Sequence, residues 1–88
     1  MIVTDKWLKM KALLENEYDW PANYRFKFII PKEKESEVES MFPSEKIEYR
    51  ASKKGNYLSV TFQKMCQNSE DIIRIYEQAS TIKGLILL

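Results

Sequence analysis

The side chains that most often carry out catalysis are scarce in this sequence. It contains no histidine and one cysteine, Cys66. Without an imidazole there is no Ser-His-Asp triad, no Cys-His pair and no histidine metal ligand. Cys66 therefore lacks the usual base that would turn its thiol into a nucleophilic thiolate. Glu70 and Asp71, close to it in the sequence, suit the first turn of a helix. We expect a buried or tolerated thiol and no enzymatic activity.

A cluster of carboxylates offers a second kind of chemistry. It comprises Glu33, Glu35, Glu37 and Glu39. Carboxylate oxygens are the ligands that hard divalent cations prefer. On a helix, however, these side chains spread over several faces, and Lys32 and Lys34 stand beside them. We therefore expect a solvated charged surface, no metal site and no cofactor.

Basic and hydroxyl side chains form the third group. The candidate binding residues are Arg25, Lys27, Arg50, Lys53, Lys54, Asn56 and Tyr57. Together with Ser59 and Thr61, they would suit an anionic ligand or an acidic partner. The alternative is an ordinary solvated sheet face with cross-strand pairs, such as Glu48 with a basic neighbour. The whole chain has 14 basic and 13 acidic residues, and this balance argues against non-specific DNA binding.

Alternation of apolar and polar residues predicts the strands that would position these side chains. Residues 24–30 alternate, with Tyr24, Phe26, Phe28 and Ile30 on one face. Segments 47–52 and 57–63 alternate in the same way, and the last strand is the apolar run 85–88. Residues 53–56 between the second and third strands predict a hairpin turn, with Gly55 and Asn56 at positive φ.

Helical spacing of apolar residues predicts three helices. Residues 4–15 place Trp7, Met10 and Leu14 on one stripe, with Thr4 as N-cap and Val3 packed on Leu8. This helix is expected to pack on the domain, and the alternative is a detachable arm. A short helix within residues 32–42 ends before Pro43. A third begins at an N-cap, Ser69, and ends at a glycine cap, Gly84. Its apolar stripe is Ile72, Ile75, Tyr76 and Ala79.

The order of these elements predicts an α+β, ferredoxin-like β-α-β-β-α-β fold. Right-handed crossovers give a four-stranded antiparallel sheet of order 4-1-3-2. The two helices of the repeat must cover one sheet face, because the inward aromatic side chains cannot face water. The 88 residues then form one domain, with residues 1–20 as an N-terminal helical extension and residues 21–88 as the ferredoxin-like core.

Part of the sequence resembles the YbeD-like family, small bacterial proteins of unknown function. Residues 52–60 (SKKGNYLSV) resemble its S-S-K-G-x-Y-x-S-V stretch, and Tyr76-Glu77 with Ile82 and Gly84 resemble its helix-to-strand segment. Pro21 and residues 24–27 resemble its start. The resemblance covers about residues 20–88 and implies a fold similar to ACT regulatory domains, with no established activity. ACT domains often bind amino acids at a glycine-bearing loop after the first strand, and here that loop, residues 30–33, has no glycine.

The expected function is that of a small, non-catalytic, regulatory or protein-interaction module. It would act in the reducing cytoplasm, since no signal peptide or membrane-length apolar run is present. The partner would be a protein or a small anionic ligand, and pairing through the 85–88 edge would give a homodimer. RNA binding is the alternative, because residues 54–62 resemble an RNA-recognition signature. That resemblance needs an extra residue and has Ser59 where a stacking aromatic belongs.

Overall fold

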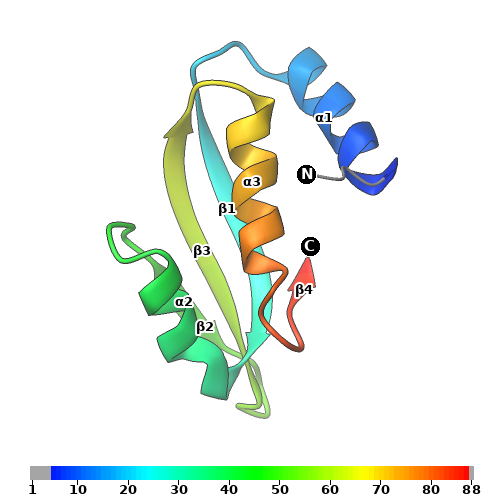
Figure 1. The fold of residues 1–88 in the computed structure, drawn as a ribbon. Helices are drawn as coiled ribbons and strands as arrows, with labels where there is room; N and C mark the ends of the chain where they lie inside the picture. The colour runs from blue at the N-terminus through cyan, green and yellow to red at the C-terminus, as the bar shows by residue number, and fades with distance from the viewer. Residues whose placement is uncertain (1–4, 88) are drawn as a thin grey trace.

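Four strands form one antiparallel sheet, and the helices lie on one side of it (Figure 1). The computed structural model describes residues 5–87. Its elements are α1 (Asp5–Glu17), β1 (Ala22–Pro31), the 3₁₀ turn η1 (Lys32–Lys34), α2 (Glu35–Met41), β2 (Glu48–Ala51), β3 (Tyr57–Cys66), α3 (Ser69–Ala79) and β4 (Ile86–Leu87). The strand order β2-β3-β1-β4 is the predicted order 4-1-3-2 read from the other edge, so the predicted fold class is confirmed.

The two central strands, β1 and β3, pair along their whole lengths. Each is ten residues long, and the pairing runs from Ala22 opposite Cys66 to Pro31 opposite Tyr57. Both strands are longer than the predicted segments 24–30 and 57–63. Because successive side chains alternate between faces, the even-numbered residues of both strands face the helices. Phe26 lies directly opposite Phe62, and their stacked rings have centroids 5.0 Å apart.

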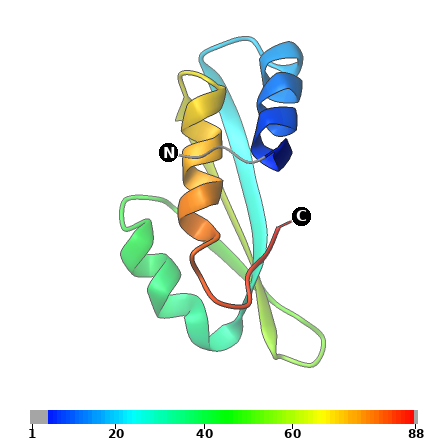
Figure 2. The ribbon, with the colours of Figure 1, turned by 45° about the vertical axis from the view of Figure 1, so that its right-hand side comes forward.

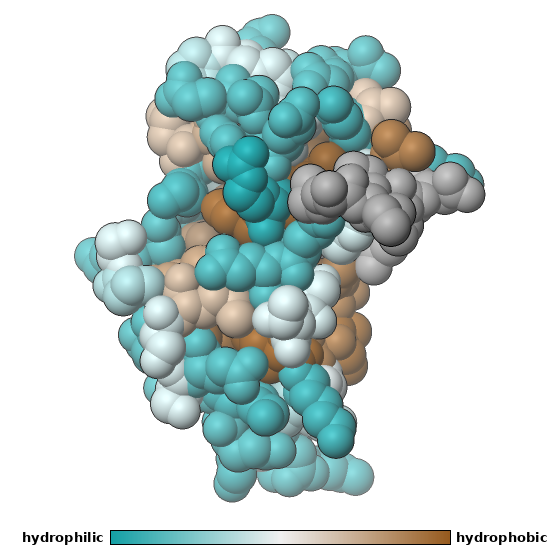
Figure 3. Space-filling model, viewed as in Figure 1, coloured by the Kyte–Doolittle hydropathy of each residue, from teal (hydrophilic) through white to brown (hydrophobic). Residues whose placement is uncertain are grey.

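The helices of the repeat close over these aromatic side chains. Val38 and Phe42 at α2, and Ile72 and Tyr76 on α3, are buried in the same core as Phe26. Figures 1 and 2 show both helices on one side of the sheet, and hydrophilic side chains cover much of their outer surface (Figure 3). The segment expected to be one short helix begins with the 3₁₀ turn η1 and continues as α2.

Helix α1 packs against α3 and does not extend away from the core. Trp7 and Leu14 are 8% and 6% exposed. Lys11 Nζ lies 3.1 Å from Glu70 Oε1, which ties the two helices together at the surface. The helix ends at Glu17, beyond the predicted end at residue 15. The predicted N-cap Thr4 and the predicted contact of Val3 lie outside the described residues.

The link between α1 and β1 carries the second tryptophan, Trp20. Its ring centroid lies 5.9 Å from that of Tyr18, whose ring in turn contacts Tyr24 on β1. Both tryptophans therefore lie on the helix side of the sheet, in or against the core. No helix within residues 5–87 combines the length and apolar character needed to cross a membrane.

The start of α3 differs from the prediction by one residue. Asn68, and not Ser69, is the N-cap, and its Oδ1 accepts a hydrogen bond from the Asp71 backbone N–H at 3.0 Å. Ser69 is the first residue of the helix and is fully buried. Its hydroxyl donates a hydrogen bond to the carboxylate of Glu15 on α1. The sequence shows two adjacent residues that can cap a helix, and the packing of α1 decides between them.

Two glycines adopt positive φ for different reasons. Gly55, in the β2–β3 turn, has φ 74°, as predicted. The prediction of positive φ for Asn56 is wrong, because Gly55 and Gly84 are the residues with positive φ in the described chain. Gly84 was expected to cap the last helix, but α3 ends at Ala79 with Ser80 as its C-cap. Gly84 (φ 86°) instead lies in the turn before β4, against the ring of Pro31.

The edge strand β4 is shorter than the predicted segment 85–88. It comprises Ile86 and Leu87, opposite Ile29 and Phe28 of β1, and Leu88 lies outside the described residues. Strand β2 likewise covers Glu48–Ala51 of the predicted 47–52. The sheet is therefore a long two-stranded centre with a short strand on each side.

Alanine substitutions at the two glycines separate backbone strain from steric contact. An alanine at positive φ costs about 1–2 kcal/mol at either position. At Gly84 its Cβ would also lie 2.8 Å from Pro31 Cγ, whereas at Gly55 it would meet nothing within 4 Å. We expect Gly55→Ala to lower the free energy of unfolding by about 1–2 kcal/mol and Gly84→Ala by about 2–4 kcal/mol. Urea denaturation measures both values, and equal losses would contradict the close approach to Pro31.

Candidate binding site on the open sheet face

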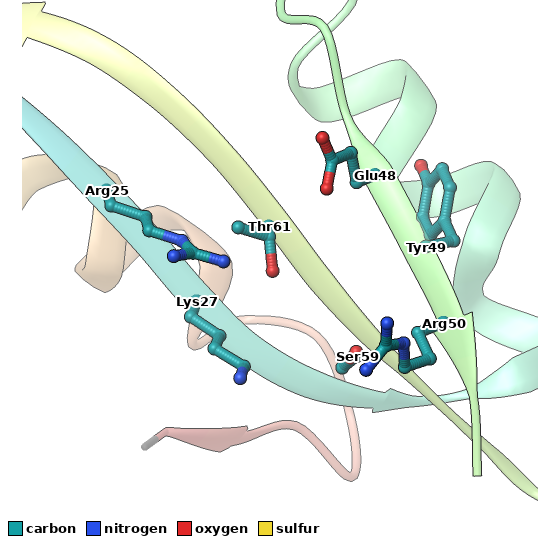
Figure 4. Close-up of a pocket in the computed structure, with 7 residues that line it drawn as sticks. All are labelled: Arg25, Lys27, Glu48, Tyr49, Arg50, Ser59 and Thr61. Carbon is teal, nitrogen blue, oxygen red and sulfur yellow. The ribbon is translucent and has the colours of Figure 1, made fainter.

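The face of the sheet opposite the helices carries a shallow hollow rich in basic side chains. Its volume is about 390 Å³, and we call it the basic hollow. It is lined by Arg25, Lys27, Glu48, Tyr49, Arg50, Ser59 and Thr61 (Figure 4). The strand pleat explains this composition, because odd-numbered residues of β1 and β3 and even-numbered residues of β2 point away from the helices. Tyr49 is the exception, since its ring points toward α2.

Strand register brings the polar groups of the basic hollow into adjacent rows. Lys27 lies opposite Thr61, which lies opposite Glu48 on its other side. In the next row, Ser59 lies opposite Arg50. Figure 4 shows the side chains of Arg25 and Arg50 reaching toward the central strand β3 from opposite sides. The two hydroxyl groups therefore lie between basic side chains contributed by two other strands.

The positive charge of the basic hollow is only partly compensated. Arg25, Lys27 and Arg50 make no ion pair within residues 5–87, whereas Lys11, Lys34, Lys64 and Arg74 do. Glu48 is the carboxylate among the lining residues. Guanidinium, ammonium and hydroxyl groups are hydrogen-bond donors that match the oxygens of a carboxylate or phosphate. The arrangement can therefore hold an oxyanion.

An apolar hollow adjoins the basic one on the same face. Its volume is about 370 Å³, and it is lined by Ile29, Arg50, Ala51, Ser52, Tyr57, Ser59 and Ile86. Tyr57 and Ile86 remain 43% and 49% exposed. We call Ile29, Tyr57 and Ile86 the apolar patch. Arg50 and Ser59 line both hollows, so the patch is continuous with the basic hollow.

The seven residues expected to bind a ligand fall in three places. Arg25, Lys27 and Arg50 meet in the basic hollow, and Tyr57 belongs to the apolar patch. Lys53, Lys54 and Asn56 lie in the exposed β2–β3 turn and line neither hollow. Asn56 has a structural task there, because its backbone carbonyl accepts a hydrogen bond from the Lys32 N–H at 3.0 Å.

Sequence reasoning overlooked Ile29 and Ile86 as surface residues. Ile86 lies in a run of consecutive apolar residues, 85–88, where alternation does not reveal which side chain faces out, whereas Ile29 occupies an outward position in the alternation of residues 24–30. The available signal was Ile29 itself, at the outward position that follows Arg25 and Lys27 in the strand. An apolar residue there interrupts an otherwise polar face.

The glutamate segment lies on the other side of the sheet. Tyr49 Oη donates a hydrogen bond of 2.5 Å to Glu39 Oε1, and burial, together with this bond, raises the pKa of Tyr49. Glu37 lies 3.7 Å from Lys34. Across residues 5–87, no group of three acidic, cysteine or histidine side chains comes together as metal ligands would. Glu37 and Glu39 each contact one neighbouring side chain.

Cys66, at the end of β3, is fully buried in the core. Its Sγ donates a hydrogen bond to the Lys64 carbonyl at 3.5 Å. Burial raises the pKa of the Cys66 thiol, and the charge of Asp71 raises it further. The thiolate is therefore less populated than for a free cysteine at the same pH.

The reactivity of Cys66 with iodoacetamide tests this description. Because the thiolate is the reactive form, we expect alkylation of the folded chain near pH 8 to be at least about tenfold slower than in concentrated urea. Raising the pH should accelerate the unfolded chain first, since its thiol keeps the lower pKa. Mass spectrometry of timed samples measures both rates. Equal rates at pH 8 would show that the thiol is accessible and ionised in the fold.

One protein-family model matches this chain, over residues 15–88. The matched range contains the whole β-α-β-β-α-β core and leaves most of α1 ahead of it. No match was found among curated proteins or solved structures. The match is consistent with the YbeD-like resemblance of residues 20–88. The chain belongs to the DUF493 family, a family of proteins of unknown function.

Proposed function

We propose that this chain is a small non-catalytic binding module whose open sheet face holds an oxyanion of a ligand or partner. The oxyanion is a carboxylate or a phosphate, and it occupies the basic hollow. Regulation or protein interaction, and not turnover of a substrate, would be its task. A cytoplasmic setting belongs to the same proposal, since a chain whose single cysteine is a buried free thiol suits a reducing compartment.

The observation that carries this proposal is the convergence of Arg25, Lys27 and Arg50 without an ion pair in the described chain. Three like charges, two on β1 and one on β2 across the central strand β3, repel one another, and Glu48 offsets part of this repulsion. A bound oxyanion would offset more of it and would accept hydrogen bonds from Ser59 or Thr61. Because the side chains are exposed, each contact contributes modestly, about 0.2–1 kcal/mol for a pair of this kind. Binding should accordingly weaken as salt is added.

The alternative, RNA binding, has less support from this face. Proteins that bind single strands stack successive bases on several aromatic side chains. Among the outward positions of β1 to β4 in the described chain, Tyr57 is the aromatic residue. It lines the apolar hollow with Ile29 and Ile86, where Arg50 is the basic side chain.

Titration of the ¹⁵N-labelled chain at low salt, followed by amide chemical shifts, tests the proposal. The probes are inorganic phosphate and a hexaglutamate peptide. We expect shifts to concentrate at residues 25–27, 48–50 and 59–61. Lys27→Gln should raise the dissociation constant about three- to fivefold, since it removes one exposed charge contact.

The matched control is Lys9→Gln, which makes the same charge change at an exposed position on α1. It should leave the dissociation constant unchanged. Equal effects of the two substitutions, or shifts spread over all lysine-bearing surfaces, would show general electrostatic attraction and overturn the proposal.

A further inference from the structure

The open sheet face has a basic end and an apolar end. Along β1, outward positions pass from Arg25 through Lys27 to Ile29. Ile29 lies opposite Ser59 on one side and opposite Ile86 on the other. With about 3.3 Å per residue, the distance from the Arg25 row to the Ile29 row is about 13 Å. The helices pack on the opposite side of the sheet, so they leave the apolar patch exposed.

An exposed apolar patch beside basic groups without an ion pair in the described chain is complementary to a ligand that carries both apolar and negatively charged groups. Transfer of Ile29, Tyr57 and Ile86 out of water favours binding in proportion to the apolar area covered. The oxyanion supplies the complementary charge next to them. Arg50 on β2 and Ile86 on β4 lie at opposite ends of one row, three strand spacings apart, so a ligand that engages both must span about 14 Å, the length of about four residues of extended chain. One amino acid is too short to do so.

On the basis of the proposed function, we propose that the occupant is an extended segment of a partner protein that carries an acidic residue beside apolar ones. The acidic carboxylate lies between Lys27 and Arg50, and the apolar side chains cover the apolar patch. Small-molecule sites are concave and enclose most of their ligand. Here both hollows are shallow and lie on one sheet surface, which suits a segment of a macromolecule.

A nucleic acid fits this face less well than such a segment. Its backbone carries a phosphate at every nucleotide, so an RNA strand spanning both ends would place charge on Ile29 and Ile86. A protein segment can place charge at one end and apolar side chains at the other.

The experiment compares peptides of one composition in different orders. The block peptides are Leu-Leu-Ser-Glu-Glu and its reverse, because the direction of the segment on the sheet is open. The comparison peptide, Leu-Glu-Ser-Glu-Leu, distributes the same residues evenly. Hexaglutamate and a uridine hexamer complete the set. We expect one block peptide to bind at least about fivefold more tightly than both the even peptide and hexaglutamate, as measured by amide chemical shifts.

Substitutions in the apolar patch then test whether the tighter binding of the block peptide depends on contacts with this patch. Ile86→Thr and Ile29→Thr keep a β-branched side chain suited to a strand and remove apolar surface. Each should weaken the block peptide about fivefold and leave hexaglutamate unchanged. Leu13→Gln, which removes a side chain 63% exposed on α1, is the control and should change neither. Unchanged amide shifts at the other strands verify that each variant keeps the fold. If one of the two variants does not fold, the other still tests the inference.

The outcomes separate this inference from the proposed function. If hexaglutamate still binds at Lys27 while the block peptides gain nothing, or the patch variants bind them normally, the inference is overturned and oxyanion binding stands. If no anionic probe shifts the residues of the basic hollow, both fail. Tighter binding of the uridine hexamer through the same residues would replace the protein segment with a nucleic acid.

Discussion

The pairing of β1 with β3 in one register is the constraint on which the rest of the structure depends. Phe26 and Phe62 face each other across the two strands and stack at the centre of the core. A slip of one residue would turn Arg25 and Lys27 toward the helices and Phe26 and Phe28 toward water. The aromatic pair thus fixes the interior and, through the pleat, the composition of the open face. The same strand register therefore determines both the packing of the core and the composition of the candidate binding site.

The order of the elements was enough to predict the strand order, and the alternation of residues 24–30 was enough to predict the outward position of Arg25 and Lys27. The pattern is strong there because large aromatic residues alternate with charged ones. It fails at residues 85–88, where every residue is apolar and periodicity does not distinguish the two faces. The apolar patch became visible only once the pairing of Ile29 with Ile86 was known.

Local signals near the helix ends were also ambiguous, for a related reason. Asn68 and Ser69 are both good caps, and the choice depends on Glu15, which is distant in sequence. Gly84 has the residue type of a helix cap, but its φ and small size serve the approach of Pro31. In each case a tertiary contact, absent from the local pattern, determined the role. The predicted binding residues of the β2–β3 turn were ambiguous in the same way, because their residue types are compatible both with an exposed turn and with a ligand-binding site.

The placement of the two tryptophans gives this chain a useful optical asymmetry. Trp7 is buried and Trp20 packs against the core, both on the helix side, whereas Tyr57 is the aromatic residue on the outward positions of the described strands. Intrinsic tryptophan emission should therefore change strongly when the domain unfolds and remain almost constant when a ligand binds to the open sheet face. Tryptophan fluorescence can thus report unfolding without interference from binding, while tyrosine absorbance or tyrosine NMR signals report binding.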